Sequence, residues 1–505
     1  MSENGPVVSS SAARHRSVSG WFEWLWTSIA ERGRAFAPIP SESIAPLERA
    51  RLLAGSMLAE RGEASGAAVA RELLAVIETL DAEAYDGFLV YLAVHFQPEE
   101  AAVAKAAQAY LDKPSPQAAA QLANIAEPPR QELLRRINMG PGGTAALVQM
   151  RARLPGLMAK HPEISLLDGD LRHLFGSWFN RGFLELRQID WQTPAAILEK
   201  LIAYEAVHEI QGWEDLRRRL APDRRCYAFF HPSLPGEPLI FVEVALVKGL
   251  AGDVQALLGR DTDLQIQRKR YHEADTAIFY SISNCQEGLR GISFGNFLIK
   301  QVVEELRASK PDLKQFSTLS PIPGFRRWLR SQLENGKTAY DGPKAEMAAL
   351  LKLSNHAEGD EKAVLLSVLE NGPWWEDAKI SAAAEPLLMH FCARFLTKSP
   401  KGLSRADPVA RFHLGNGARL ERINWMGNPS ERGLRESYGL MVNYLYDPEE
   451  IEANHEAFAK EGKVVHSASV AELIEPRAKT AALPGLGRKA SLQRKAMTLL
   501  LSHQK

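Results

Sequence analysis

The feature that most constrains this chain is a change of sequence pattern near residue 184. Over residues 21–157, Ala, Leu, Glu and Arg dominate, and apolar residues recur at spacings of three and four. The Lys-Pro-Ser-Pro stretch at 113–116 ends one such run and begins the next. This part has no strand pattern, so an antiparallel helical bundle is predicted for residues 18–183.

The pattern after residue 184 predicts strands among helices. Apolar runs at 225–231 and 239–247 flank a Pro-Gly turn, which is typical of a β-hairpin. Further strands are expected at 277–283 and 315–319, with a helix at 295–308 between them and mainly helices over 325–400. We therefore expect an α+β chain in which a mixed α/β domain, residues 184–475, follows the bundle.

Charge and cysteine content limit the classes of partner and compartment. The 505 residues include 61 Lys+Arg and 61 Asp+Glu, so any anionic ligand must be held by a local basic site, and nucleic acid is not an expected partner. Three cysteines without a CxxC pair favour a reducing cytoplasm.

No apolar run reaches the roughly 20 residues of a membrane span. Residues 1–17 and the basic residues 476–505 are expected to be disordered tails, although the latter could touch an anionic partner.

A glycine-containing loop follows the strand expected at 277–283. It contains Gly288, Gly291 and Gly295 and leads into a helix. Such a loop can direct backbone N–H groups, together with the helix dipole, toward a phosphate. Glycine-rich turns often have no ligand, so the spacing alone leaves both interpretations open.

Several longer motifs carry a resemblance to a known family. They are Phe-Tyr-Ser-Ile-Ser at 279–283, Gly-Leu-Arg-Gly at 288–291, Leu-Ser-Pro-Ile-Pro-Gly-Phe at 319–325 and Phe-His-Leu-Gly-Asn-Gly at 412–417. In this order they resemble the malonyl-CoA decarboxylase family, whose catalytic domain has a GNAT acetyltransferase-like fold. The resemblance covers residues 140–446. It implies conversion of malonyl-CoA to acetyl-CoA and CO2 in malonate or fatty acid metabolism, without a cofactor, by a homotetramer.

The resemblance also implies roles for individual residues. His413, Ser320 and Tyr446 match the catalytic positions of the family. The expected malonyl-CoA binding residues are Arg290, Gly291, Ile292, Ser293, Phe294, Gly295 and Asn296, with Ser283 beside the expected oxyanion. Some family members have an acidic residue where this chain has Ser293, so a role for that carboxylate does not transfer. Arg326, Arg327 and Lys300 are further candidates for the adenine and ribose phosphate.

Elementary chemistry supports these roles. Loss of CO2 from a malonyl thioester leaves an enolate, and the thioester carbonyl is the electron sink, so no cofactor is required. His413 is expected to be partly protonated near neutral pH and to donate a proton to carbon. Asp407 and Pro408 predict the start of its helix. Ser320, in a proline-restricted turn, could bond the carboxylate or the enolate oxygen. A structural histidine, a turn serine and a core tyrosine are the alternatives.

Other classes of function are less well supported by the residues. A GNAT-type acyltransferase and a non-catalytic acyl-CoA-binding regulator remain alternatives. A Ser–His hydrolase is disfavoured because Ser320 lacks a Gly-x-Ser-x-Gly context.

No metal site is predicted. Residues 138–144 lack the Gly-Lys-Ser/Thr ending of a phosphate loop and are interpreted as a helix–helix loop with Thr144 as N-cap. Trp21, Trp24 and Trp26 are expected to pack in the bundle or against another subunit of a homo-oligomer.

Overall fold

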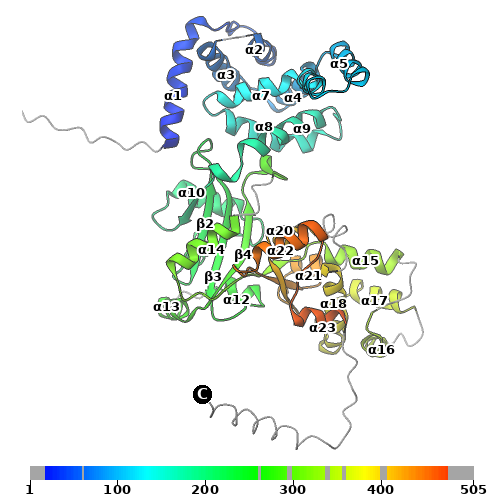
Figure 1. Cartoon of the computed structure of the whole chain (residues 1–505). Coiled ribbons are helices and arrows are strands. Elements are labelled where there is room, and N and C mark those ends of the chain that lie inside the picture. Colours follow the sequence, from blue (N-terminus) through cyan, green and yellow to red (C-terminus); the bar gives the residue numbers. More distant parts are fainter. Residues whose placement is uncertain are drawn as a thin grey trace, which may run out of the picture. The chain divides into compact units, whose positions relative to one another are not determined.

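The structure, a computed structural model, describes residues 18–59, 62–259, 263–292, 298–335, 342–354, 360–397 and 407–475 (Figure 1). The chain divides into two compact units, Met1–Leu319 and Ser320–Lys505. The expected tails, 1–17 and 476–505, lie outside the described residues, and so do the side chains of Trp21, Trp24 and Trp26. Within the described residues, no helix is both long and apolar enough to cross a membrane.

The first unit begins with the predicted helices, most of which gather in one group in Figure 1. They are α1 (Val18–Gly33), η1 (Arg34–Phe36), α2 (Pro46–Ala59), α3 (Glu63–Glu78), α4 (Ala82–His95), α5 (Glu100–Asp112), α6 (Pro116–Ala126), α7 (Pro129–Met139), α8 (Gly143–Leu157), α9 (Ile164–Trp178) and η2 (Arg181–Phe183). Ser115 caps α6, accepting a hydrogen bond from Ala118 N at 3.1 Å, as the Pro-Ser-Pro break predicts. The predicted helical organisation is confirmed.

The prediction for Thr144 was wrong in detail. Residues 138–144 do connect two helices, but the residue before α8 is Gly142, whose φ of 74° is left-handed. The helix therefore begins at Gly143, two residues earlier than a Thr144 cap requires. The Thr144 hydroxyl instead donates to Asn138 Oδ1 at 2.8 Å.

A mixed sheet with the order β1-β2-β3-β4-β5 completes the first unit. Its strands are β1 (Glu185–Ile189), β2 (Arg224–Phe230), β3 (Pro238–Val247), β4 (Thr276–Asn284) and β5 (Gln315–Thr318). The first four pair antiparallel, which includes the predicted β2–β3 hairpin, and β4 pairs parallel to β5. The crossover between β4 and β5 contains α14 (Leu298–Ser309), since a parallel pair cannot be joined by a tight turn.

Short helices accompany the sheet. They are α10 (Ala195–Tyr204), α11 (Trp213–Arg219), α12 (Val254–Leu258), α13 (Leu264–Glu273) and η3 (Glu287–Leu289). Cys226, Ala228 and Phe230 alternate along β2 and pack in one core cluster with Leu198 and Leu216 of α10 and α11. Strand β1 was not predicted, because its side chains are largely exposed and lack an apolar alternation.

The second unit is mainly helical, as predicted for 325–400. Its elements are β6 (Ser320–Pro321), α15 (Phe325–Asn335), α16 (Lys344–Leu353), α17 (Glu361–Glu370), α18 (Ala378–Thr397), α20 (Pro408–Gly415), β7 (Arg419–Asn424), α21 (Glu431–Ser437), β8 (Met441–Leu445), α22 (Ile451–Glu456), η4 (Ala457–Glu461) and α23 (Ala468–Ile474). Strand β8 pairs antiparallel with both β6 and β7. With the first unit, this confirms the predicted α+β class.

Candidate active site

The second unit brings together the three residues predicted to be catalytic. Ser320 Oγ lies 3.1 Å from His413 Nε2, and the Tyr446 hydroxyl lies 2.7 Å from His413 Nδ1. All three residues are at least 95% buried. Both imidazole nitrogens are therefore engaged, and the ring orientation is fixed from two sides.

The local sequence explains how His413 is presented. Asp407 caps α20, accepting from Ala410 N at 2.8 Å, and Pro408 occupies the first turn, where its missing N–H has no cost. The helix ends at Gly415, and Gly417 adopts a φ of 81° that lets the chain turn back. These bounds confirm the prediction and place His413 in the last turn of a short, capped helix.

Two strands position Ser320 and Tyr446 around His413. Ser320 and Pro321 form β6 and pair with Val442 and Met441 of β8. Tyr446 directly follows the end of β8. Tyr444 lies two residues earlier, and its ring stacks on the His413 imidazole with centroids 4.8 Å apart and planes at 24°. Tyr444 is not among the residues predicted for the site. The period-two spacing from Tyr446 was the available signal that it faces the same histidine.

Burial determines the protonation state of the site. It lowers the pKa of His413 to about 3 and raises the pKa values of the Tyr444 and Tyr446 hydroxyls well above their ordinary value. The expectation that His413 is partly protonated near neutral pH is therefore not met in this structure. The neutral imidazole has one N–H, so it donates to one of Ser320 and Tyr446 and accepts from the other.

The residues predicted around the phosphate loop belong to the first unit. Ser293, Phe294, Gly295 and Asn296 lie outside the described residues. Gly291 is exposed with a φ of 77°, and the exposed Arg290 side chain lies 3.8 Å from Glu287. Ile292 is partly buried.

The start of this loop is tied to the helical region. Arg151 of α8 donates from Nη1 to the carbonyls of Gly288 (2.6 Å) and Arg290 (3.0 Å), and its Nε bonds Asp168 at 2.8 Å. A Cβ at Gly288 would lie 1.8 Å from the Val148 carbonyl oxygen, so glycine is required for this close approach. The first part of the predicted loop thus has a fixed backbone conformation.

Ser283 has a different environment from the one predicted. Its hydroxyl is buried and donates to Glu205 Oε1 at 3.2 Å. The same carboxylate also accepts from Ser281 and from the backbone N–H groups of Val207 and His208. The Ser283 side chain is therefore engaged inside the first unit, and only a backbone role remains as predicted.

Arg326 also has an internal partner. Its guanidinium donates to both oxygens of Glu370, at 3.1 and 2.6 Å, and lies over the Tyr438 ring. The Tyr438 hydroxyl donates to the same carboxylate at 3.0 Å. This ion pair neutralises Arg326, so it is a weaker candidate for a phosphate than the sequence suggested.

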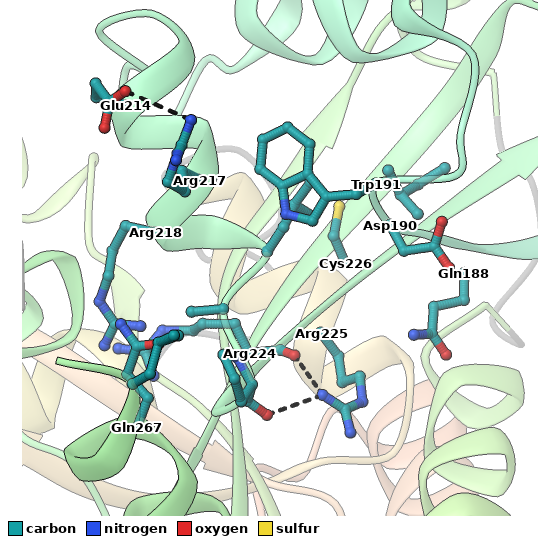
Figure 2. Close-up of a pocket in the computed structure, with 15 residues that line it drawn as sticks. Gln188, Asp190, Trp191, Glu214, Arg217, Arg218, Arg224, Arg225, Cys226 and Gln267 are labelled. Carbon is teal, nitrogen blue, oxygen red and sulfur yellow. Dashed lines mark hydrogen bonds and ion pairs between the residues drawn. The ribbon is translucent and has the colours of Figure 1, made fainter. Parts of the chain in front are cut away.

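A separate cavity of about 510 Å³ lies in the first unit (Figure 2). Its lining includes Trp191, Arg217, Arg224 and Arg225, and Arg217 is paired with Glu214 at 3.7 Å. None of the described residues predicted for catalysis or substrate binding lines it. The cavity is therefore distinct from the candidate active site.

Comparison with known families decides the relationship that the motifs suggested. The malonyl-CoA decarboxylase C-terminal domain model matches residues 182–483, and the N-terminal domain model of the same name matches 96–179. The chain belongs to the malonyl-CoA decarboxylase family. The C-terminal match includes Ser320, His413 and Tyr446.

Individual members of the family are similar in sequence to this chain. A mitochondrial malonyl-CoA decarboxylase of Anser anser anser is 39% identical over 336 residues, which cover 66% of this chain and 66% of that protein. The Rattus norvegicus protein of the same name is 37% identical over 68% of this chain and 70% of its own length. The matched region thus spans about two thirds of these relatives.

Solved structures extend the similarity. The malonyl-CoA decarboxylase structure from Rhodopseudomonas palustris is 46% identical with a TM-score of 0.74, covering 85% of this chain and 99% of that one. The Agrobacterium vitis structure is 49% identical with a TM-score of 0.73, covering 84% and 99%. The fold described above is thus that of the malonyl-CoA decarboxylase family.

Proposed function

We propose that this protein decarboxylates malonyl-CoA to acetyl-CoA and CO2. The observation that carries the proposal is the Ser320–His413–Tyr446 array, buried and hydrogen-bonded in a chain of the malonyl-CoA decarboxylase family. The reaction needs a rigid donor near the carbon skeleton and a proton for carbon, and the array contains both kinds of group.

Each member of the array has a proposed task. Binding holds the malonyl carboxylate out of the plane of the thioester, so that the breaking C–C bond overlaps the carbonyl π system. The electron pair of that bond moves onto the thioester as CO2 leaves. Ser320 Oγ–H hydrogen-bonds the carboxylate or the enolate oxygen. His413 then gives a proton to the enolate carbon and regains one from solvent, while Tyr446 fixes the ring.

The low pKa of His413 is compatible with this role. Burial is the cause of the low pKa. A malonyl carboxylate beside the imidazole introduces a negative charge in a region of low dielectric, which favours the imidazolium. The substrate therefore brings about the protonation of the acid that later completes the reaction.

One assay tests this proposal against its alternatives. The purified protein is incubated with malonyl-CoA alone, and CO2 and acetyl-CoA are measured. Equimolar release of both supports decarboxylation. An acyltransferase would transfer the acyl group only when an acceptor amine is added, and a non-catalytic regulator would bind malonyl-CoA without consuming it.

We also propose that the loop at 290–296 binds the CoA pyrophosphate through backbone N–H groups. Gly291→Val should weaken acetyl-CoA binding about tenfold or more, because a branched side chain blocks close approach of the phosphates. Isothermal titration measures the affinity. Gly291→Ala is the matched control, since it shares the strain at φ 77° without the bulk. Unchanged affinity in a folded Gly291→Val variant would place the phosphate site elsewhere.

Domain roles and assembly form a further part of the proposal. We assign residues 18–183 to an oligomerisation bundle and 184–475 to the catalytic domain of a cytoplasmic homo-oligomer, with a tetramer as the expected form. Exposed Leu111 (70%) and Leu166 (48%) on the helices of this region are apolar side chains that a subunit contact would cover. Light scattering at micromolar concentration should give a multiple of 55.9 kDa, and a monodisperse monomer would contradict the assignment.

A further inference from the structure

The Asp407 carboxylate contacts two segments that carry different members of the array. The side chain is fully buried. Its Oδ1 accepts from Ala410 N at 2.8 Å, within the helix of His413. Its Oδ2 accepts from Gly324 N at 3.3 Å, at the end of the turn that follows Ser320. One carboxylate thus bonds the backbone of both segments.

We propose that Asp407 is a positioning residue, which holds Ser320 and His413 at hydrogen-bonding distance by joining the turn after Ser320 to helix α20. The inference rests on the proposed function of these two residues and adds a residue to it. Asp407 does not touch the array itself. It acts through the backbone of the two segments that bear Oγ and Nε2.

Both segments are stiff enough to transmit a shift. Pro321 and Pro323 restrict the turn between Ser320 and Gly324, and the Phe325 N–H bonds the Ile322 carbonyl at 3.2 Å. On the other side, His413 is carried in the same short helix that Asp407 caps. A displacement of the turn relative to the helix therefore changes the 3.1 Å contact between Oγ and Nε2.

Helix capping alone does not explain a carboxylate at this position. A cap needs one acceptor, and Asn or Ser supplies it equally well. Burial raises the pKa of Asp407 to about 6, although the N–H groups of Ala410, Gly324 and Val409 oppose the shift. Since the folded pKa is above the unfolded one, the stability contribution of this group is lost as pH rises to about 6, and the ionised form costs stability at neutral pH.

Neighbouring elements contribute to the raised pKa of Asp407. Among the described residues, Glu436 of α21 raises this pKa, and Cys392 of α18 and Tyr444 of β8 also interact electrostatically with Asp407. An amide would cap α20 without burying a charge. What the carboxylate adds is a second acceptor oxygen, and that oxygen bonds Gly324.

Asp407→Asn separates the capping of α20 from the hydrogen bond to Gly324. The amide oxygen still accepts from Ala410 N, but the NH2 group then faces the Gly324 N–H and repels it. We expect kcat for malonyl-CoA to fall about 10- to 100-fold, the usual consequence of a misplacement near 1 Å, with KM changed less than about threefold. The melting temperature should stay within a few degrees of wild type.

Asp360→Asn is the matched control. Asp360 is the exposed N-cap of α17 in the same unit and accepts from Lys362 N at 3.4 Å. Its substitution should leave kcat unchanged. Wild-type kcat in folded Asp407→Asn, or an equal loss in Asp360→Asn, would overturn the positioning role. If Asp407→Asn does not fold, Asp407→Ser keeps one capping acceptor and Gly324→Pro removes the donor, and each should reproduce the loss of kcat.

A crystal structure of Asp407→Asn gives a readout that does not depend on activity. The inference predicts that the distance from Ser320 Oγ to His413 Nε2 lengthens beyond hydrogen-bonding range, and an unchanged distance contradicts it. Failure of the proposed function looks different: the wild-type protein would then release no CO2 from malonyl-CoA, whatever the geometry of the variant.

Discussion

Replacing His413 by asparagine is expected to lower turnover of malonyl-CoA roughly 10²- to 10⁴-fold, the range associated with loss of a general acid. Asparagine keeps a hydrogen bond to one neighbour but has no acidic proton for the enolate carbon. KM should change less than kcat, because the proton is transferred to carbon only after the substrate has bound. Steady-state release of CO2 and acetyl-CoA measures both parameters. Near-normal turnover would remove His413 from the mechanism and leave water or another residue as the acid.

The stability of the same variant distinguishes a catalytic histidine from a structural one. The pKa of His413 falls from 6.5 to about 3 on folding, so the unfolded chain binds an extra proton below pH 6.5. Wild-type stability should therefore decrease by about 2 kcal/mol between pH 7 and 5 through this group, and the variant should lack that decrease. His390→Asn is the control for a buried histidine of the same unit, which bonds the Leu473 carbonyl at 2.7 Å. It should lower stability without a comparable loss of turnover.

Much of the fold follows from local sequence patterns. The β2–β3 hairpin has an apolar run on each side of a Pro-Gly turn, and α20 has Asp407 and Pro408 at its start and glycines at its end. Such signals involve only a few neighbouring residues, so they can be recognised in a single sequence. Strand β1 has no such signal, because its exposed side chains depend on pairing with β2 rather than on an apolar pattern.

The candidate site could be predicted only in part, because its residues meet through tertiary contacts. Ser320, His413 and Tyr446 come from segments far apart in the chain, and only the family resemblance joined them. The bond from Asp407 to Gly324 and the stacking of Tyr444 on His413 are tertiary contacts without a local signature. The protonation state also depends on burial. An exposed histidine titrates near neutrality, whereas burial lowers the pKa of His413 to about 3.

Ser320→Ala is expected to reduce kcat roughly 10²- to 10³-fold with a smaller effect on KM, as for removal of one donor to a developing oxyanion. The hydroxyl matters most while charge moves from the carboxylate to the enolate oxygen. Ser320 Oγ also holds His413 Nε2 at 3.1 Å, so its loss frees the imidazole on one side. Single-turnover kinetics with malonyl-CoA separate the chemical step from product release and measure the effect directly.

A double-mutant cycle tests whether Ser320 and His413 act as a unit. If they do, the Ser320→Ala/His413→Asn variant should be little slower than His413→Asn alone, because residues that cooperate in one step are strongly non-additive. Ser437→Ala is the matched control, since Ser437 is equally buried in the same unit and bonds the Leu440 carbonyl at 2.7 Å. Its turnover should remain near wild type. Multiplicative losses in the double variant would mean that Ser320 stabilises the oxyanion independently of the histidine, and wild-type turnover in Ser320→Ala would reduce Ser320 to a turn residue.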